Sequence, residues 1–193
     1  MEPTILKRQL KTVPPADKSK TLAKPAKAAA MIIGPECIEH LNYRIQQEDY
    51  STRVYLAMSM WLNNMGYLNG AKLWKKYSDE EQAHANWARE YLLNLGVQPE
   101  TRMLEAPMES FTGLPEIIRR SYDHEVEITM QVKELADHAL KMGNHMLYEL
   151  ALKYNHEQNE ELGKLQDLID QLEAFGEDKI AMRLLDHELK DYL

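Results

Sequence analysis

Four stretches of this chain carry apolar residues at alternating steps of three and four, and no other feature constrains the fold as strongly. That spacing is typical of a helix face that packs into the core of a bundle. The four stripes are Leu41, Ile45, Glu48, Thr52, Tyr55, Ser59 and Leu62; Trp74, Tyr77, Glu81, His84, Ala88, Tyr91 and Leu95; Leu114, Ile118, Ser121, Glu125, Ile128, Val132, Leu135, Ala139 and Met142; and Leu147, Ala151, Tyr154, Gln158, Glu161, Leu165, Leu168 and Leu172. Their ends are mostly apolar, but carboxylate, imidazole or carboxamide groups interrupt every middle. We therefore expect a helical bundle with a polar centre.

The punctuation between the stripes indicates how the helices are connected. The sequence predicts helices over about 36–64, 69–95, 114–142 and 144–174, with a short fifth over about 178–190. Every link is short except residues 96–113. Short links make neighbouring helices antiparallel, whereas a long crossover returns along the bundle and makes the helices it joins parallel. The predicted fold is therefore all-α, a four-helix bundle with one long crossover and a short fifth helix at the C-terminus.

The fifth helix is too short to be stable alone. Ile180, Leu184, Leu185 and Leu189 are predicted to lie on one face of it. We expect this apolar face to be held by neighbouring chains at a symmetry axis.

The charge distribution separates a tail from the rest of the chain. Residues 1–30 hold seven basic and two acidic residues with four prolines, whereas residues 31–193 hold 16 basic and 29 acidic residues. Such a Lys- and Pro-rich segment cannot bury a core, so it is predicted to be a disordered tail on a folded domain of residues 31–193. It is either a solvated leader or an extension upstream of a true start at Met31. The acidic domain favours cations over nucleic acid as partners.

Cysteine content and hydropathy exclude several classes of protein. Cys37 is the only cysteine, which excludes a disulfide framework and a multi-cysteine zinc site. The longest apolar run near the N-terminus, residues 28–33, is too short for a signal peptide or a membrane span. We expect a soluble cytoplasmic protein with no membrane partner.

The polar middles of the stripes predict a metal site. Glu48, Glu81, Glu125 and Glu161 fall at one height with a single imidazole, His84, and the stripes contain no Lys or Arg. Buried carboxylates repel one another unless a cation binds them. Oxygen-rich ligation with one His suits iron or manganese better than a structural zinc.

Several of these residues have a second interpretation. A lone Glu in a predicted seam is often a misplaced surface residue, but four helices interrupted at one height argue for a site. Tyr55 is either a core tyrosine or part of the site. Glu80, Glu157 and Glu160 form either a solvated acidic face or an accessory metal site. The remaining histidines are predicted at the surface or at helix ends, namely His40, His124, His138, His145, His156 and His187.

Over about residues 31–193 the chain resembles the non-haem ferritins of bacterial type. The segments that carry the resemblance are Leu41-Asn42 through Glu48-x-Tyr50 and Tyr55; Asp79-Glu80-Glu81-Gln82-Ala83-His84-Ala85; His124-Glu125; Glu157-Gln158-x-x-Glu161; and Leu184-Leu185-Asp186-x-Glu188-Leu189. The resemblance implies a ferritin-like fold, a di-iron ferroxidase centre within each subunit and a 24-subunit cage that stores ferric mineral.

The resemblance also implies roles for individual residues. Glu48, Glu81 and His84 match the first iron site; Glu81, as a bridge, matches the second with Glu125 and Glu161. The family's tyrosine near the centre matches Tyr55, Gln158 lies alongside, and the third iron site of bacterial members matches Glu80, Glu157, Glu160 and Glu161.

Three departures separate the chain from related families. Bacterioferritins place a haem-ligating Met where this chain has Gln82, and they end the site with Glu-x-x-His where it has Gln158 and Glu161. No haem is therefore expected. Mini-ferritins lack the fifth helix and build their site between subunits, whereas this chain is expected to hold its site within one bundle and to form a fifth helix over residues 178–190.

Three functions follow as expectations. The first is oxidation of Fe(II) by O₂ or H₂O₂ at the di-iron centre, with Glu48, Tyr55, Glu81, His84, Glu125, Gln158 and Glu161 taking part, followed by mineral storage. The second is a cage whose basic tail, similar to those of some mini-ferritins, binds DNA weakly and coats nucleic acid. The third is a di-iron oxidase for an organic substrate, which would need an open cavity.

Overall fold

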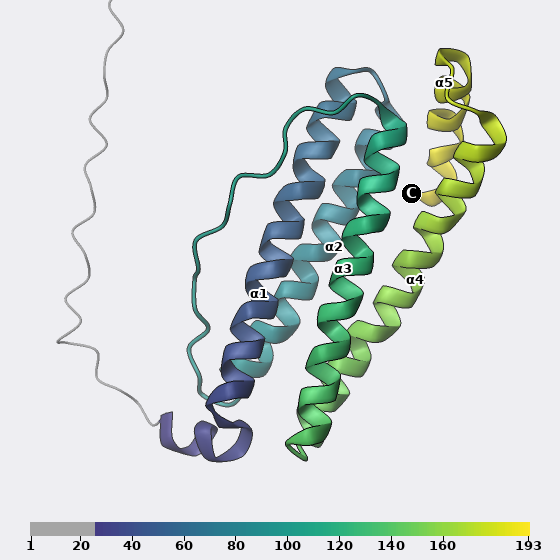
Figure 1. Ribbon diagram of the computed structural model, residues 1–193. Coiled ribbons are helices and arrows are strands. Elements are labelled where there is room, and N and C mark those ends of the chain that lie inside the picture. The colour runs from purple at the N-terminus through teal and green to yellow at the C-terminus, as the bar shows by residue number, and fades with distance from the viewer. Residues whose placement is uncertain (1–25) are drawn as a thin grey trace, which may run out of the picture.

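The computed structural model describes residues 26–193, with side chains from Ile32 onward. Four long helices stand side by side (Figure 1). They are α1 (Ala26–Asn64), α2 (Leu68–Asn94), α3 (Leu114–Lys141) and α4 (His145–Phe175), followed by the short α5 (Lys179–Glu188) and the 3-10 turn η2 (Leu189–Tyr192). No strand occurs within residues 26–193. The predicted all-α fold is confirmed, and residues 1–25 of the predicted tail lie outside the described residues.

The connections have the predicted lengths. Tight turns join α1 to α2 and α3 to α4, whereas the segment from Leu95 to Gly113 runs the length of the bundle beside α1 (Figure 1). Three hydrogen bonds hold this crossover on α1: Gln46 Nε2 donates to the Met103 carbonyl at 2.9 Å, the Glu100 amide donates to Asn42 Oδ1 at 3.0 Å, and Arg102 Nη2 donates to Glu39 Oε2 at 2.7 Å. The crossover makes α2 parallel to α3. Because α1 is antiparallel to α2, it is also antiparallel to α3.

The first helix begins ten residues earlier than predicted. It starts at Ala26, inside the range assigned to the tail, and is interrupted at Gly34, where φ is 74° and ψ is 156°. Glycine adopts this left-handed φ without a Cβ clash, and Pro35 then opens the second segment, where a missing N–H costs nothing. Residues 28–30 are all alanine, which has the highest helix propensity and so favours the extra helical turns.

The fifth helix turns a different face to the bundle from the one predicted. Leu185 and Leu189 are buried as expected, but Ile180 is 75% exposed and Leu184 is 53% exposed. The face that α5 turns inward carries Met182, Leu185 and Asp186, and Asp186 Oδ1 accepts a hydrogen bond from the Gly70 amide at 2.8 Å. The helix therefore packs against α2 and α4 of its own chain, with two apolar side chains left outside.

The apolar ends of the stripes form two layers separated by the polar centre. One layer, which includes Trp74 and Leu168, lies at the α5 end, and the other, which includes Leu41 and Leu147, lies at the opposite end. Nearly every predicted stripe residue is buried, although Met142, at the end of its stripe, is half exposed. Within the described residues, no helix combines the length and the hydropathy that crossing a membrane would require.

Candidate metal centre

Each of the four long helices buries one glutamate at mid-height. Glu48 on α1, Glu81 on α2, Glu125 on α3 and Glu161 on α4 are 1%, 2%, 1% and 7% exposed. His84 lies one turn after Glu81 on the same face of α2 and is 4% exposed. The helical period brings the four glutamates to one level, because each occupies the central position of its stripe.

The ligand atoms of these residues form two groups that share one carboxylate. Glu48, Glu81 and His84 offer three atoms within 4.8 Å of one another, and so do Glu81, Glu125 and Glu161. His84 Nδ1 lies 3.6 Å from Glu81 Oε2 and 3.9 Å from Glu161 Oε1. Two cations held by these groups would therefore be neighbours with Glu81 between them.

Gln158 connects the second group through its amide. Its Nε2 donates to Glu125 Oε2 at 3.0 Å and to Glu161 Oε2 at 2.6 Å, while its Oε1 accepts from Thr129 Oγ1 at 2.7 Å. Thr129 Oγ1 also lies 2.7 Å from the carbonyl oxygen of Glu125, so its single hydrogen is shared between these two acceptors, and helix α3 positions the amide. Gln158 thus holds two carboxylates in place without adding a charge.

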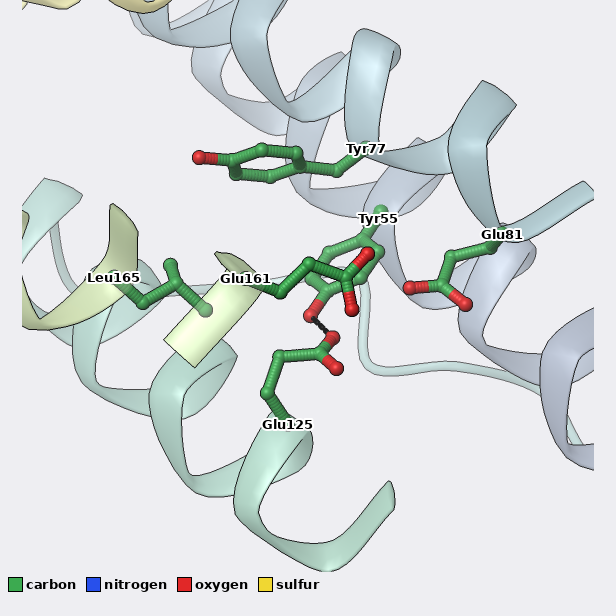
Figure 2. A pocket seen from close by; sticks show the side chains of 6 residues that line it. All are labelled: Tyr55, Tyr77, Glu81, Glu125, Glu161 and Leu165. Carbon is green, nitrogen blue, oxygen red and sulfur yellow. Dashed lines mark hydrogen bonds between the residues drawn. The ribbon is translucent and has the colours of Figure 1, made fainter. Parts of the chain in front are cut away.

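Two buried tyrosines support the centre through hydrogen bonds. The hydroxyl of Tyr55 donates a hydrogen bond to Glu125 Oε1, as Figure 2 shows. Tyr154 on α4 donates to the backbone carbonyl of His84 at 2.7 Å and so ties α4 to α2 at the height of the imidazole. Of the two interpretations of Tyr55, the contact with Glu125 favours a place in the site.

Burial and mutual repulsion strongly perturb these carboxyl groups. Burial, together with the charges of Glu125 and Glu48, raises the pKa of Glu161 to about 10. The same causes raise the pKa of Glu81 well above its usual range, and burial raises the pKa of Glu125. Burial lowers the pKa of His84, so its imidazole is neutral and free to bind a metal.

One cation near the centre was missed by the sequence analysis. Arg44 is only 2% exposed, its Nε lies 2.8 Å from Glu48 Oε1, and its Nη1 donates to Gln131 Oε1 at 3.0 Å. The stripes themselves contain no Lys or Arg, but this buried cation reaches the centre from outside them. Arg44 lies beside the α1 stripe, one turn before Glu48, and a wider stripe would have included it.

His124 is also closer to the centre than predicted. Its Nε2 shares a hydrogen bond of 2.7 Å with Ser51 Oγ, and its ring packs edge-on against Tyr55 at 5.7 Å between centroids. Burial lowers the pKa of His124. It contacts the tyrosine rather than the carboxylate groups, and its place beside Glu125 in the sequence was the available signal.

The residues predicted for a third site are only partly brought together. Glu157 and Glu161 join His84 in a further group of three ligand atoms. Glu80 is half-buried with one carboxylate oxygen lacking a hydrogen-bond partner, and Glu160 is exposed. Neither Glu80 nor Glu160 belongs to such a group within the described part of the chain.

The space between the side chains of the centre is very small. In Figure 2 the carboxylates of Glu81, Glu125 and Glu161 point toward one another beneath Tyr77. The cavity that they line has a volume of about 10 Å³. That is room for about one water molecule, so the centre has no space for an organic substrate.

The sequence matches the family described as "Ferritin-like domain" over residues 38–175. The chain belongs to the ferritin-like family. A bacterial non-heme ferritin of Escherichia coli O6:H1 is 29% identical over 158 residues, which cover 82% of this chain and 96% of that protein. The bacterial non-heme ferritin of Campylobacter jejuni is 25% identical over 160 residues, 83% of this chain and 96% of the relative.

Solved structures place the whole bundle in the same family. An open pore ferritin from the archaeon Archaeoglobus fulgidus superposes with a TM-score of 0.79 at 28% identity, covering 82% of this chain and 98% of that one. Family membership supports iron storage and metal binding. These ferritin relatives lend no support to the alternative of a nucleic-acid coat, which rests on a tail that is mostly outside the described residues.

The perturbed carboxyls of this ferritin-like chain predict how its stability depends on pH. Between about pH 4.5 and 10, Glu161 holds a proton in the folded protein but not in the unfolded one. Folding therefore takes up protons, and the free energy of unfolding falls as pH rises, by up to about 1.4 kcal/mol per pH unit for each such carboxyl. Chelator-treated protein should melt at a lower temperature at about pH 9 than at about pH 6.

A variant tests whether Glu161 causes this slope. Glu161→Gln keeps the shape of the protonated side chain, so its melting temperature should change less with pH than that of the wild type. A wild-type protein that melts higher at about pH 9 would contradict the predicted sign.

Proposed function

We propose that the chain is a ferroxidase: it oxidises Fe(II) to Fe(III) at the centre between the four helices and stores the ferric product as a mineral. The observation that carries the proposal is the pair of ligand groups sharing Glu81. Two neighbouring Fe(II) ions can together give two electrons to one O₂, which takes up two protons and leaves as H₂O₂. With H₂O₂ as the oxidant, two electrons and two protons give two waters.

The proposed roles follow from the contacts. Glu48 and His84 hold the first Fe(II), Glu125 and Glu161 hold the second, and Glu81 bridges the two. Gln158 and Tyr55 orient the second pair of carboxylates through the hydrogen bonds that they donate. The raised pKa values of Glu81 and Glu161 mean that Fe(II) binding releases protons.

Iron is also proposed to reach an accessory third position. The roles of Glu157 and Glu161 at this position are supported by the group of ligand atoms that they form with His84. Glu80 and Glu160 lie one turn or less away from this group along their helices. Because Glu80 and Glu157 are half-buried and Glu160 is exposed, an ion at this position would exchange more readily than the buried pair.

We also propose a homo-oligomeric cage of 24 chains, supported by the ferritin relatives and by Ile180 and Leu184, which α5 leaves exposed for a neighbouring chain. The oxidation of an organic substrate is disfavoured because the cavity at the centre has a volume of only about 10 Å³.

The proposal is tested by adding Fe(II) anaerobically to metal-free assembled protein and then admitting O₂. Uptake of two Fe(II) ions per chain, followed by rapid O₂ consumption and Fe(III) absorbance, is expected. Preloading with Zn²⁺ should abolish the rapid phase because Zn²⁺ competes for the same ligands and has no redox chemistry. Oxidation no faster than in buffer alone would overturn the proposal.

A further inference from the structure

A second set of metal-ligating side chains lies away from the carboxylate centre, where α1 follows its kink and α3 ends. The imidazole rings of His40 and His138 are 4.3 Å apart between centroids, with 41° between their planes. Both side chains are half-buried. The Nε2 atom of His138 is buried and has no hydrogen-bond partner among the described residues. A buried imidazole nitrogen without a partner is a ligand atom available to a metal ion.

Two carboxylates flank this histidine pair. Glu36 precedes His40 by one turn on α1, and Glu134 precedes His138 by one turn on α3. Residues four apart share a face of a helix, and α1 runs antiparallel to α3, so the two glutamates approach the pair from opposite sides. All four side chains line one hollow of about 660 Å³, together with Tyr43.

Arg44 separates this hollow from the carboxylate centre. Along α1, Arg44 lies one turn after His40 and one turn before Glu48, so the two sites are about 12 Å apart along the helix axis. The buried guanidinium pairs with Glu48 and repels any cation moving between the sites. The hollow is therefore a separate site and not a continuation of the centre.

We propose that His40 and His138 bind a divalent transition-metal ion of the Zn²⁺ or Co²⁺ class. Two imidazole nitrogens suit these ions, whereas Mg²⁺ and Ca²⁺ require oxygen ligands. Among the described residues, three ligand atoms lie within 4.8 Å of one another only in the groups that include Glu81 or His84. A carboxylate of Glu36 or Glu134 must therefore rotate inward to complete the site, and their exposed side chains are free to do so.

Co²⁺ titration of the metal-free assembled protein tests the proposal, with visible absorbance reporting imidazole ligation. His40→Ala and His138→Ala should each lose about one bound Co²⁺ per chain. His145→Ala is the matched control, because His145 is an exposed histidine at the start of α4 and its removal should leave the stoichiometry unchanged. Of the Glu36→Gln and Glu134→Gln substitutions, the one that weakens Co²⁺ binding marks the carboxylate that completes the site.

The outcome is independent of the proposed ferroxidase activity. The His40→Ala protein should oxidise Fe(II) at the wild-type rate, because His40 lies outside the carboxylate centre. Unchanged Co²⁺ stoichiometry in the His40→Ala protein would overturn the proposal, as would an equal loss in the His145→Ala protein. If His138→Ala fails to assemble, the His40→Ala result decides alone.

Discussion

Replacing Glu81 with alanine should slow Fe(II) oxidation by about two orders of magnitude or more. Glu81 is the one carboxylate common to both groups of ligand atoms, so its removal weakens both proposed iron positions and leaves nothing to bridge them. Loss of a hydrogen-bond partner behind a metal ligand already costs about 10- to 100-fold, and loss of a shared ligand should cost at least as much. Stopped-flow absorbance of Fe(III) formation measures the effect.

Stability separates lost chemistry from lost folding in this experiment. The metal-free Glu81→Ala protein should melt no lower than the wild type, because the substitution removes a buried carboxylate from a repelling cluster. Glu90→Ala is the matched control, since Glu90 lies on the same helix but is exposed, and it should oxidise Fe(II) normally. A Glu81→Ala protein with the wild-type rapid phase would show that the site is misassigned.

Replacing Arg44 with alanine should destabilise the metal-free protein by about 3–5 kcal/mol. The substitution leaves the 1% exposed carboxylate of Glu48 without its ion-pair partner and opens a cavity beside Gln131. A divalent cation bound between Glu48 and Glu81 would replace the lost positive charge. Zn²⁺ should therefore raise the melting temperature of the variant more than that of the wild type.

An exposed ion pair provides the comparison for Arg44. Arg119 pairs with Glu177 at the surface, where both side chains are about half exposed, and such pairs contribute about 0–1 kcal/mol. Arg119→Ala should therefore melt close to the wild type. If the Arg44→Ala and Arg119→Ala proteins melt at the same temperature, the buried ion pair with Arg44 does not offset the cost of burying the Glu48 carboxylate.

The backbone period explains why so much of the centre could be predicted. Glu48, Glu81, Glu125 and Glu161 each occupy the middle of a stripe with a period near 3.5 residues, and an α-helix projects such residues onto one side. Once four helices pack their stripes together, the middle residues meet whatever the details of packing. The long crossover could be predicted separately, from the length of the link over residues 96–113.

Arg44 shows where this reasoning stops. Its position beside the stripe is compatible with exposure, because a long arginine side chain can reach solvent from the edge of a buried face. It is buried here because α3 presents Gln131 to its guanidinium and α1 presents Glu48 one turn away. A stripe defined by a single period marks only the centre of the buried face of a helix. It does not show which residues at the edge of that face are covered by a second neighbouring helix, as α3 covers Arg44 here.

The amino-acid sequence by itself determined the helices, their order and the four carboxylates that face inward, since these depend on local propensity and on the helical period. The tertiary structure alone decided the rotation of α5, the burial of Arg44 and the pairing of His40 with His138. Each of these depends on how far one helix is shifted and turned against another. His40 and His138 are 98 residues apart in the chain, and only the packing of α1 against α3 places their rings side by side.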